Sequence, residues 1–242
     1  MKATALEFRF RYLIHAVIYV LGFTTPWNHW LHLDTVRTWQ WLASWPARVG
    51  WMSFSTSTNA VLGLGVLFAL AGAVLRTWGA AYLGSSVVQD FSMQGDRMVA
   101  AGPYRYMRNP LYLGTFLHTF ALALLMPPSG ALFTIIAIGL VQMRLLLAEE
   151  AFLRAKLGEP YRTYCAAVPR IVPSLRARVP ESAARPSWGM GFLGEIYVWG
   201  VVVSFLAFGW RYNSLLIIQG VVVSLGVSLV ARAFVPKPAE AA

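Results

Sequence analysis

Residues 110–150 read PLYLGTFLHTFALALLMPPSGALFTIIAIGLVQMRLLLAEE, and this stretch decides the fold. Two apolar runs, 110–126 and 131–147, are separated by a short connection that contains Pro127, Pro128 and Gly130. Proline and glycine break helices, and so short a connection leaves room only for a tight turn. Each run is near the length of about 17 to 25 residues that a bilayer core requires. We therefore expect two antiparallel membrane helices that are neighbours.

Four further apolar runs lie at residues 12–27, 59–75, 192–210 and 214–234. The composition agrees with a membrane protein, because 57% of the residues are hydrophobic and only 12% are charged. Ordinary soluble domains carry about 25% charged residues. We predict an all-α fold, a polytopic membrane helical bundle of about six transmembrane helices. The first run follows basic residues but lacks a small-residue cleavage site, which favours an uncleaved signal anchor.

The basic residues are distributed asymmetrically along this predicted topology. If the N-terminus lies inside, the outer loops hold only Arg37, Arg48 and Arg211 of the 20 Lys and Arg residues. Such a bias satisfies the positive-inside rule and predicts a multi-pass protein, of a bacterial inner membrane, with both termini cytoplasmic. Topology explains the net charge of +10 better than a nucleic-acid partner, since the basic residues gather on no single face. Membrane lipids are the expected partners, and the oligomeric state stays open.

The loop after the first run is rich in tryptophan, which is typical of rings at lipid headgroups. His29 and His32 in this loop have no third metal ligand nearby, so no metal site is expected. The single Cys165 excludes an intramolecular disulfide framework. The tryptophans of this loop are Trp27, Trp30, Trp39, Trp41 and Trp45.

Three units are expected along the chain. Residues 1–58 form the anchor span and the Trp-rich loop, 59–178 form the core with its polar segments, and 179–242 form a linker and a last two-span hairpin. The stretch SLRARVPESAARPSWGMG, residues 174–191, is rich in Pro, Ser, Ala and Gly and predicts a poorly structured connection. Most ionisable residues fall in 76–109 and 148–191, where function is expected.

The first chemistry-bearing stretch is GPYRYMRNPLYLG, residues 102–114. Asn109 can cap a helix whose first turn contains Pro110. The positive end of that helix would face Arg105 and Arg108, which predicts a site for a carboxylate or phosphate at the membrane boundary. Alternatively, both arginines only anchor the topology by holding lipid headgroups.

The second stretch is LLLAEEAFLRAKLGEPYRTYCAAVPR, residues 145–170. Glu149 and Glu150 stand at the membrane edge, where ionisable groups usually face a cavity or a partner. The hairpin returns them to the side of Arg108. An i, i+4 pair between Glu150 and Arg154 would account for one glutamate only.

After this helix, Gly158 predicts a stop and Pro160 a restart. Tyr161 and Tyr164 then share one helix face, at i, i+3. Their rings suit a base or a cation, although interfacial anchoring explains them equally well.

The two stretches together resemble the membrane methyltransferases related to isoprenylcysteine carboxyl methyltransferase and phospholipid N-methyltransferase. The resemblance covers roughly residues 102–173. It implies S-adenosyl-L-methionine bound in a cytoplasmic cofactor pocket, with a lipophilic acceptor that reaches the methyl group from the bilayer. By this similarity the cofactor-binding residues are Gly102, Pro103, Tyr104, Arg108, Asn109, Pro110, Tyr112, Glu149, Tyr161 and Tyr164.

The resemblance also indicates candidate catalytic residues. Glu150 would take up the proton of an amine acceptor, and Arg170 would orient a carboxylate acceptor. Asn109 and Ala167 depart from the residues of the eukaryotic isoprenylcysteine enzymes, so O-, N- and S-methylation all stay open. Two other functions remain as alternatives: an NADPH-dependent, steroid-reductase-like membrane reductase and a non-catalytic membrane organiser.

Polar residues also interrupt the apolar runs. Glu195, Arg144 and Gln142 either line an acceptor channel or reach the membrane interface.

Overall fold

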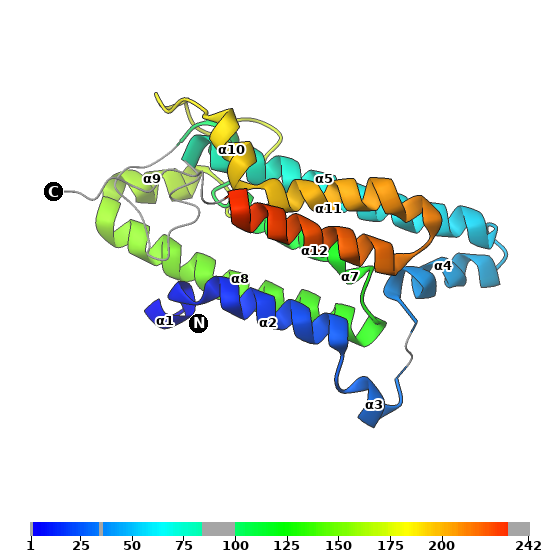
Figure 1. Ribbon diagram of the computed structural model, residues 1–242. Coiled ribbons are helices and arrows are strands. Elements are labelled where there is room, and N and C mark those ends of the chain that lie inside the picture. Colours follow the sequence, from blue (N-terminus) through cyan, green and yellow to red (C-terminus); the bar gives the residue numbers. More distant parts are fainter. Residues whose placement is uncertain (1, 34–35, 84–99, 232–242) are drawn as a thin grey trace.

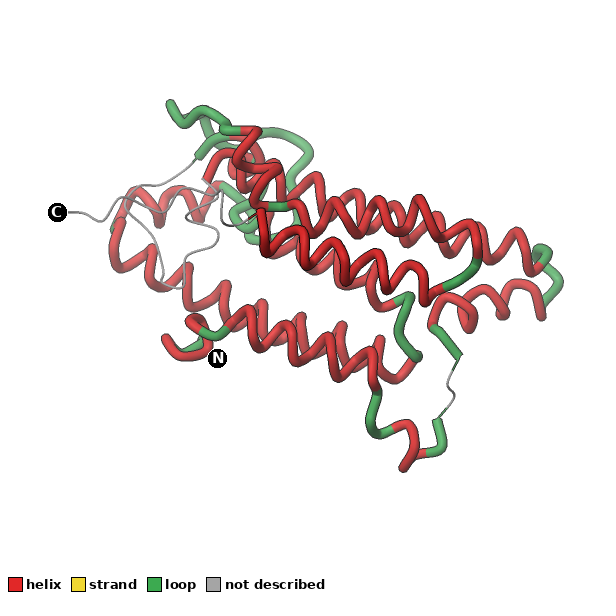
Figure 2. Tube along the Cα trace, viewed as in Figure 1, coloured by secondary structure: helices red, strands yellow, loops and turns green. Residues whose placement is uncertain are grey.

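The computed structural model describes residues 2–33, 36–83 and 100–231, and every regular element in these ranges is a helix (Figures 1 and 2). Long helices run side by side along one axis and form a bundle (Figure 1). The all-α prediction is confirmed.

The predicted helical hairpin is present. Helix α7 (Pro110–Ala123) turns through residues 124–127 into α8 (Pro128–Leu157), and the two helices are in contact. Helix α7 also lies very close to α5 (Phe54–Leu83). At Gly72 an added Cβ atom would lie 2.7 Å from the carbonyl oxygen of Gly114, so glycine permits this approach.

The N-terminal helices lie on one side of this core. Helix α1 (Ala5–Arg9) begins at Thr4, which forms a capping box with Glu7. Helix α2 (Arg11–Thr24) then runs along α8. The short α3 (Asn28–Leu31) leads to α4 (Thr38–Arg48), which packs against α5.

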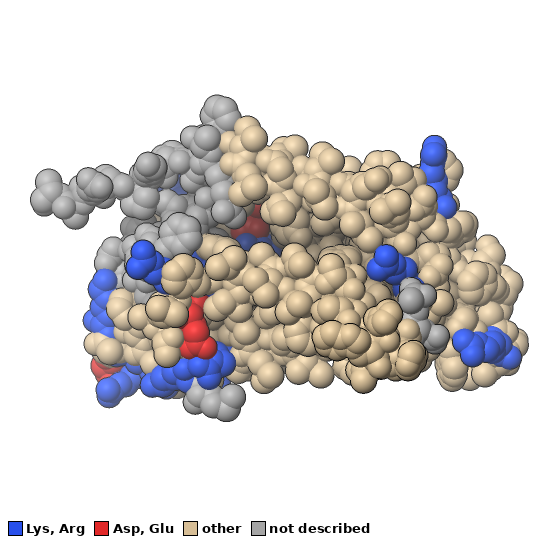
Figure 3. All heavy atoms as spheres, turned by 60° about the horizontal axis from the view of Figure 1, so that its bottom comes forward, with Lys and Arg blue, Asp and Glu red and all other residues tan. Residues whose placement is uncertain are grey.

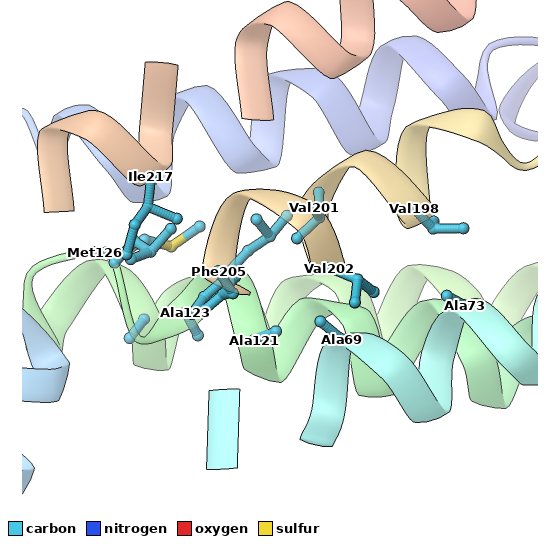
Figure 4. Close-up of a cluster of buried hydrophobic side chains, with 13 residues drawn as sticks. Ala69, Ala73, Ala121, Ala123, Met126, Val198, Val201, Val202, Phe205 and Ile217 are labelled. Carbon is cyan, nitrogen blue, oxygen red and sulfur yellow. The ribbon is translucent and has the colours of Figure 1, made fainter. Parts of the chain in front are cut away.

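The C-terminal helices cover another side of α5. They are α10 (Trp188–Gly194), α11 (Ile196–Phe208), the 3-10 turn η2 (Gly209–Arg211) and α12 (Ser214–Ala231). Figure 4 shows how Val201, Val202 and Phe205 of α11 meet the small residues Ala69 and Ala73 of α5 and Ala121 of α7. The C-terminal hairpin of α11 and α12 therefore shares the main hydrophobic core with α5 and α7.

The number of membrane spans is smaller than predicted. Among the described residues, α5, α8 and α12 are long and apolar enough to cross a bilayer, and the bent pair of α10 with α11 makes up to four candidates. Helices α2 and α7 have 14 residues each. At 1.5 Å per residue such a helix is about 21 Å long, shorter than a bilayer core of about 30 Å. The count of six is thus not confirmed.

Two segments expected to be loops have more structure than their sequences indicate. Helix α4 lies within the predicted Trp-rich loop, and its Trp39 is only 4% exposed, in contact with Val61 and Leu124. Trp39 therefore belongs to the core, so its prediction as an interfacial residue is wrong. Trp41 and Trp45 remain exposed.

The second segment is the linker at 174–187, which has no helix but is held by backbone hydrogen bonds. The amides of Ser174 and Arg178 donate to the carbonyls of Tyr106 and Arg105, at 3.0 and 2.9 Å. Ser182 and Ser187 donate in the same way to Ala100 and Ala81. The segment thus lacks regular structure, in line with the prediction, although main-chain hydrogen bonds attach it to the bundle; the predicted connection differs only at residues 188–191, where α10 begins.

Charged side chains in the space-filling view gather near the two ends of the molecule, while most of the length between them is uncharged (Figure 3). This distribution is that of an integral membrane protein.

Candidate functional site

The site lies at the end of the bundle where α8 passes into α9 (Glu159–Ala167), which we call the site end (Figure 1). The 3-10 turn η1 (Gly102–Arg105) and the start of α7 meet the last turns of α8 here. Gly158, with a φ of 63°, separates α8 from α9, as the sequence predicts.

Glu150 is the centre of this site. Its carboxylate is 3% exposed and accepts hydrogen bonds from Asn109 Nδ2 at 3.2 Å and Arg170 Nε at 3.2 Å. Arg108 Nη1 lies 3.5 Å from Oε1, and Arg154 Nη2 lies 3.7 Å from Oε2. One buried acid thus joins α7, α8 and the segment after α9, as the antiparallel hairpin predicts for Arg108 and Glu150.

Asn109 occupies the N-cap position of α7, but its side chain makes no capping bond. Its Nδ2 instead donates to Glu150 and, at 3.0 Å, to the carbonyl of Arg170. The prediction that this side chain caps the helix is wrong, because the competing carboxylate and carbonyl lie across the helix interface.

Arg108 has hydrogen-bonding capacity that the described residues leave unused. Its side chain is 8% exposed, and its Nε and Nη1 atoms have no hydrogen-bond partner. Its backbone amide is satisfied by the carbonyl of Pro169, at 2.9 Å. Buried donors without hydrogen-bond partners are costly, which singles out Arg108 among the charged residues of this cluster.

Glu149 has a different environment from Glu150. Its Oε2 accepts a hydrogen bond of 2.8 Å from the hydroxyl of Tyr112, in the first turn of α7. The two adjacent glutamates therefore have separate partners, one an uncharged phenol and the other a group of cations.

Three tyrosines fix the turn and α9 to each other. The Tyr164 hydroxyl donates to the carbonyl of Tyr104 at 2.7 Å, and the Tyr161 and Tyr164 ring centroids are 5.9 Å apart. Burial raises the pKa of all three phenols above the usual value, so they remain protonated donors at neutral pH. The Tyr161 and Tyr164 rings also pack against Ala100 and Val168, so the rings are largely enclosed by protein.

Gly102 is required by the shape of the turn. Its φ of 53° is in the left-handed region, and an added Cβ would collide with the ring of Tyr82. Pro103 follows in the first turn of η1, where its fixed φ suits the geometry. Pro110 plays the same part in α7 and is buried.

Two open cavities lie on either side of the ion pairs. The first, of about 280 Å³, is lined by Lys2, Leu147, Glu150, Ala151, Arg154 and Arg170. The second, of about 350 Å³, is lined by Arg108, residues 165–169 and Arg178. Both volumes are near the lower limit of ligand sites, about 300 Å³.

The sequence did not reveal two features near the site. Arg105 donates to the carbonyl of Val179 at 3.1 Å and pairs with Glu181, which fastens the linker to η1. Arg76, on α5, forms an ion pair with Glu195. The sequence signal for the longer α5, which carries Arg76 into the bundle, is the absence of proline in residues 76–83, RTWGAAYL.

Replacing Tyr164 by phenylalanine should lower the free energy of unfolding by about 1 to 2 kcal/mol, because the buried Tyr104 carbonyl loses its donor. Thermal unfolding in detergent would measure this. Tyr212→Phe is the matched control, since Tyr212 makes an exposed bond to Asn59. Equal melting temperatures for the two variants would contradict the role assigned to Tyr164.

The fold and the site together define an integral membrane protein with a buried, cation-rich cluster at one end of a helical bundle. Residues 60–159 match the family model described as phospholipid methyltransferase, so this part of the chain is similar to that family of membrane enzymes. Searches of curated proteins and of solved structures gave no match.

Proposed function

We propose that the protein transfers a methyl group from S-adenosyl-L-methionine to a lipophilic acceptor at the cytoplasmic surface of the membrane. The observation that carries this proposal is the buried Arg108: its Nε and Nη1 have no hydrogen-bond partner among the described residues, and its Nη1 forms a 3.5 Å ion pair with Glu150. Both residues fall inside the segment that matches the methyltransferase family. The matching segment gives no corresponding support to the reductase or the organiser.

The residues fit the polar groups of this cofactor. The Arg108 nitrogens that donate no hydrogen bond to the described residues suit its carboxylate, and Glu149 suits its ammonium group. When bound, the cofactor supplies a methyl group already activated on a sulfonium. The task left to the chain is therefore to hold donor and acceptor in line and to exclude water.

In this proposal Arg170 orients the acceptor, and Glu150, its ion-pair partner, takes up a proton from an amine acceptor. Arg170 Nη2 lies 3.1 Å from Glu150 Oε2, and its side chain is 40% exposed toward the first cavity. Such a guanidinium can orient an anionic acceptor while it remains tied to Glu150. For an amine acceptor, Glu150 stays the predicted proton acceptor, and uptake of the proton would loosen its bonds to Arg108 and Arg170.

The decisive experiment measures binding of S-adenosylhomocysteine and of NADPH to the detergent-solubilised protein. Binding of S-adenosylhomocysteine alone is expected, and binding of NADPH alone would reverse the proposal. Transfer of radiolabelled methyl from S-adenosyl-L-methionine into a total lipid extract would then identify the acceptor.

A Tyr112→Phe variant should bind S-adenosylhomocysteine about tenfold more weakly. Loss of the hydroxyl leaves Glu149 without its 2.8 Å hydrogen bond, so the carboxylate is no longer held in place. Titration calorimetry would measure the affinity. Trp41→Phe, at an exposed position on α4, should bind as the natural chain does, and equal losses in both variants would argue against a site at Tyr112.

A further inference from the structure

A second polar cluster lies inside the bundle, away from Glu150. Arg76 of α5 makes two hydrogen bonds to Glu195, which stands at the break between α10 and α11: Nε to Oε2 at 2.7 Å and Nη2 to Oε1 at 2.8 Å. Arg76 Nη1 also donates to the hydroxyl of Thr115 on α7. Ionisable groups among apolar helices are costly and usually serve a function.

The cluster retains donors that the described residues do not use. A guanidinium has five N–H groups, and these bonds engage three of them at Arg76. His118, one turn beyond Thr115, is 2% exposed, and neither of its ring nitrogens has a partner. Its ring lies against Tyr197 of α11, with centroids 5.3 Å apart.

Helix α7 connects this cluster with the site end. Thr115 and His118 lie three and six residues beyond Tyr112, which corresponds to about 4.5 and 9 Å along the helix axis. The space-filling view shows a hollow in the otherwise uncharged surface, with acidic and basic atoms at its base (Figure 3). The Arg76 side chain is itself 20% exposed.

A purely structural role does not explain this arrangement. Buried ion pairs seldom add stability over apolar residues of similar size, so an attachment of α11 to α5 does not need one. The same two helices already share an apolar core through Val201 and Phe205. An imidazole whose ring nitrogens have no hydrogen-bond partner among the described residues adds a further cost.

We propose that Arg76, Glu195 and His118 form a second subsite, which binds an uncharged oxygen in the tail of the lipophilic acceptor. This inference rests on the proposed function. Glu195 already neutralises Arg76, so a second anion would lack a counter-charge. The remaining N–H groups suit a carbonyl oxygen, such as that of an ester, about one to two helical turns below the acceptor's head. The C-terminal hairpin, outside the matched segment, would then help to select the acceptor.

The test compares binding of lipids that differ only in this oxygen. Dioleoyl phosphatidylethanolamine and phosphatidylglycerol, each as diester and as diether, would be added in detergent micelles, and lipid bound per protein counted by mass spectrometry of the intact complex. The natural chain should bind the diesters about tenfold more tightly, the effect of one or two hydrogen bonds. The double variant Arg76→Met with Glu195→Met should lose this preference, and His118→Phe should reduce it.

The matched control is an ion pair between two other helices, Arg144 of α8 with Glu7 of α1, at 2.8 Å. Its double replacement by methionine should keep the tenfold preference. Equal binding of diester and diether to the natural chain would overturn the subsite, as would a preference that survives in the Arg76, Glu195 double variant. If that double variant does not fold, His118→Phe serves instead: an unchanged preference for diester lipids in this variant would overturn the subsite. Binding of S-adenosylhomocysteine, measured in parallel, tests the proposed function separately. A protein that does not bind this compound could still prefer diester over diether lipids.

Discussion

Replacement of Arg108 by glutamine is expected to weaken binding of S-adenosylhomocysteine about 10- to 100-fold. The guanidinium is 8% exposed and has two nitrogens that donate no hydrogen bond to the described residues, so in the bound state it would donate charge-assisted hydrogen bonds from a largely dry position. Such bonds contribute about 1.5 to 3 kcal/mol each. Titration calorimetry with the solubilised protein would give the affinity.

The control for this experiment is Arg162→Gln. Arg162 lies on α9 at the same end of the bundle and also pairs with a glutamate, Glu159, but its side chain is 68% exposed. Exposed pairs contribute little, and this variant should bind as the natural chain does. If Arg108→Gln also binds normally while remaining folded, the anion site does not exist and the membrane organiser becomes the better explanation.

Replacement of Gly102 by alanine should destabilise the protein by about 3 kcal/mol and abolish cofactor binding at the site. Two costs combine at this position. An L-residue at a φ of 53° costs about 1 to 2 kcal/mol, and the added methyl group would collide with the Tyr82 ring. Overpacking of this kind costs about 1 to 3 kcal/mol. Thermal unfolding of the variant in detergent would measure the loss.

Two other glycines separate these costs. Gly158 has a φ of 63° but nothing within 4 Å of an added Cβ, so Gly158→Ala should show the backbone strain alone. Gly209 has helical φ and ψ and open space, and Gly209→Ala should be neutral. A Tyr82→Leu replacement should recover part of the stability in the Gly102→Ala background. The explanation fails if all three glycine variants melt at the same temperature.

The sequence predicts those parts of the fold that depend on local signals. Two prolines and a glycine between apolar runs were enough to predict the α7 and α8 hairpin. The antiparallel direction of these helices then brought Glu150 to Arg108, now 3.5 Å apart. The roles assigned to the individual site residues stay predictions.

Features that depend on distant partners could not be predicted. The span that includes α5 is predicted to end before Arg76, yet the helix continues to Leu83, and Arg76 is paired there with Glu195, 119 positions later. The Asn109 side chain likewise makes no local capping bond and donates instead to the carboxylate of Glu150, 41 positions away. In the sequence Trp39 is one of several tryptophans typical of a membrane interface, but in the fold it is covered by contacts that include Val61 of α5.

The linker at 174–187 has a consequence for how this chain can change over evolution. Its position depends on the main-chain amides of Ser174, Arg178, Ser182 and Ser187, which every amino acid except proline provides. Substitutions at these positions keep the amide donor, whereas proline would remove a donor at each of them. Comparison of residue identities alone would therefore make this segment look dispensable, although it carries the four bonds that secure it against η1 and α5.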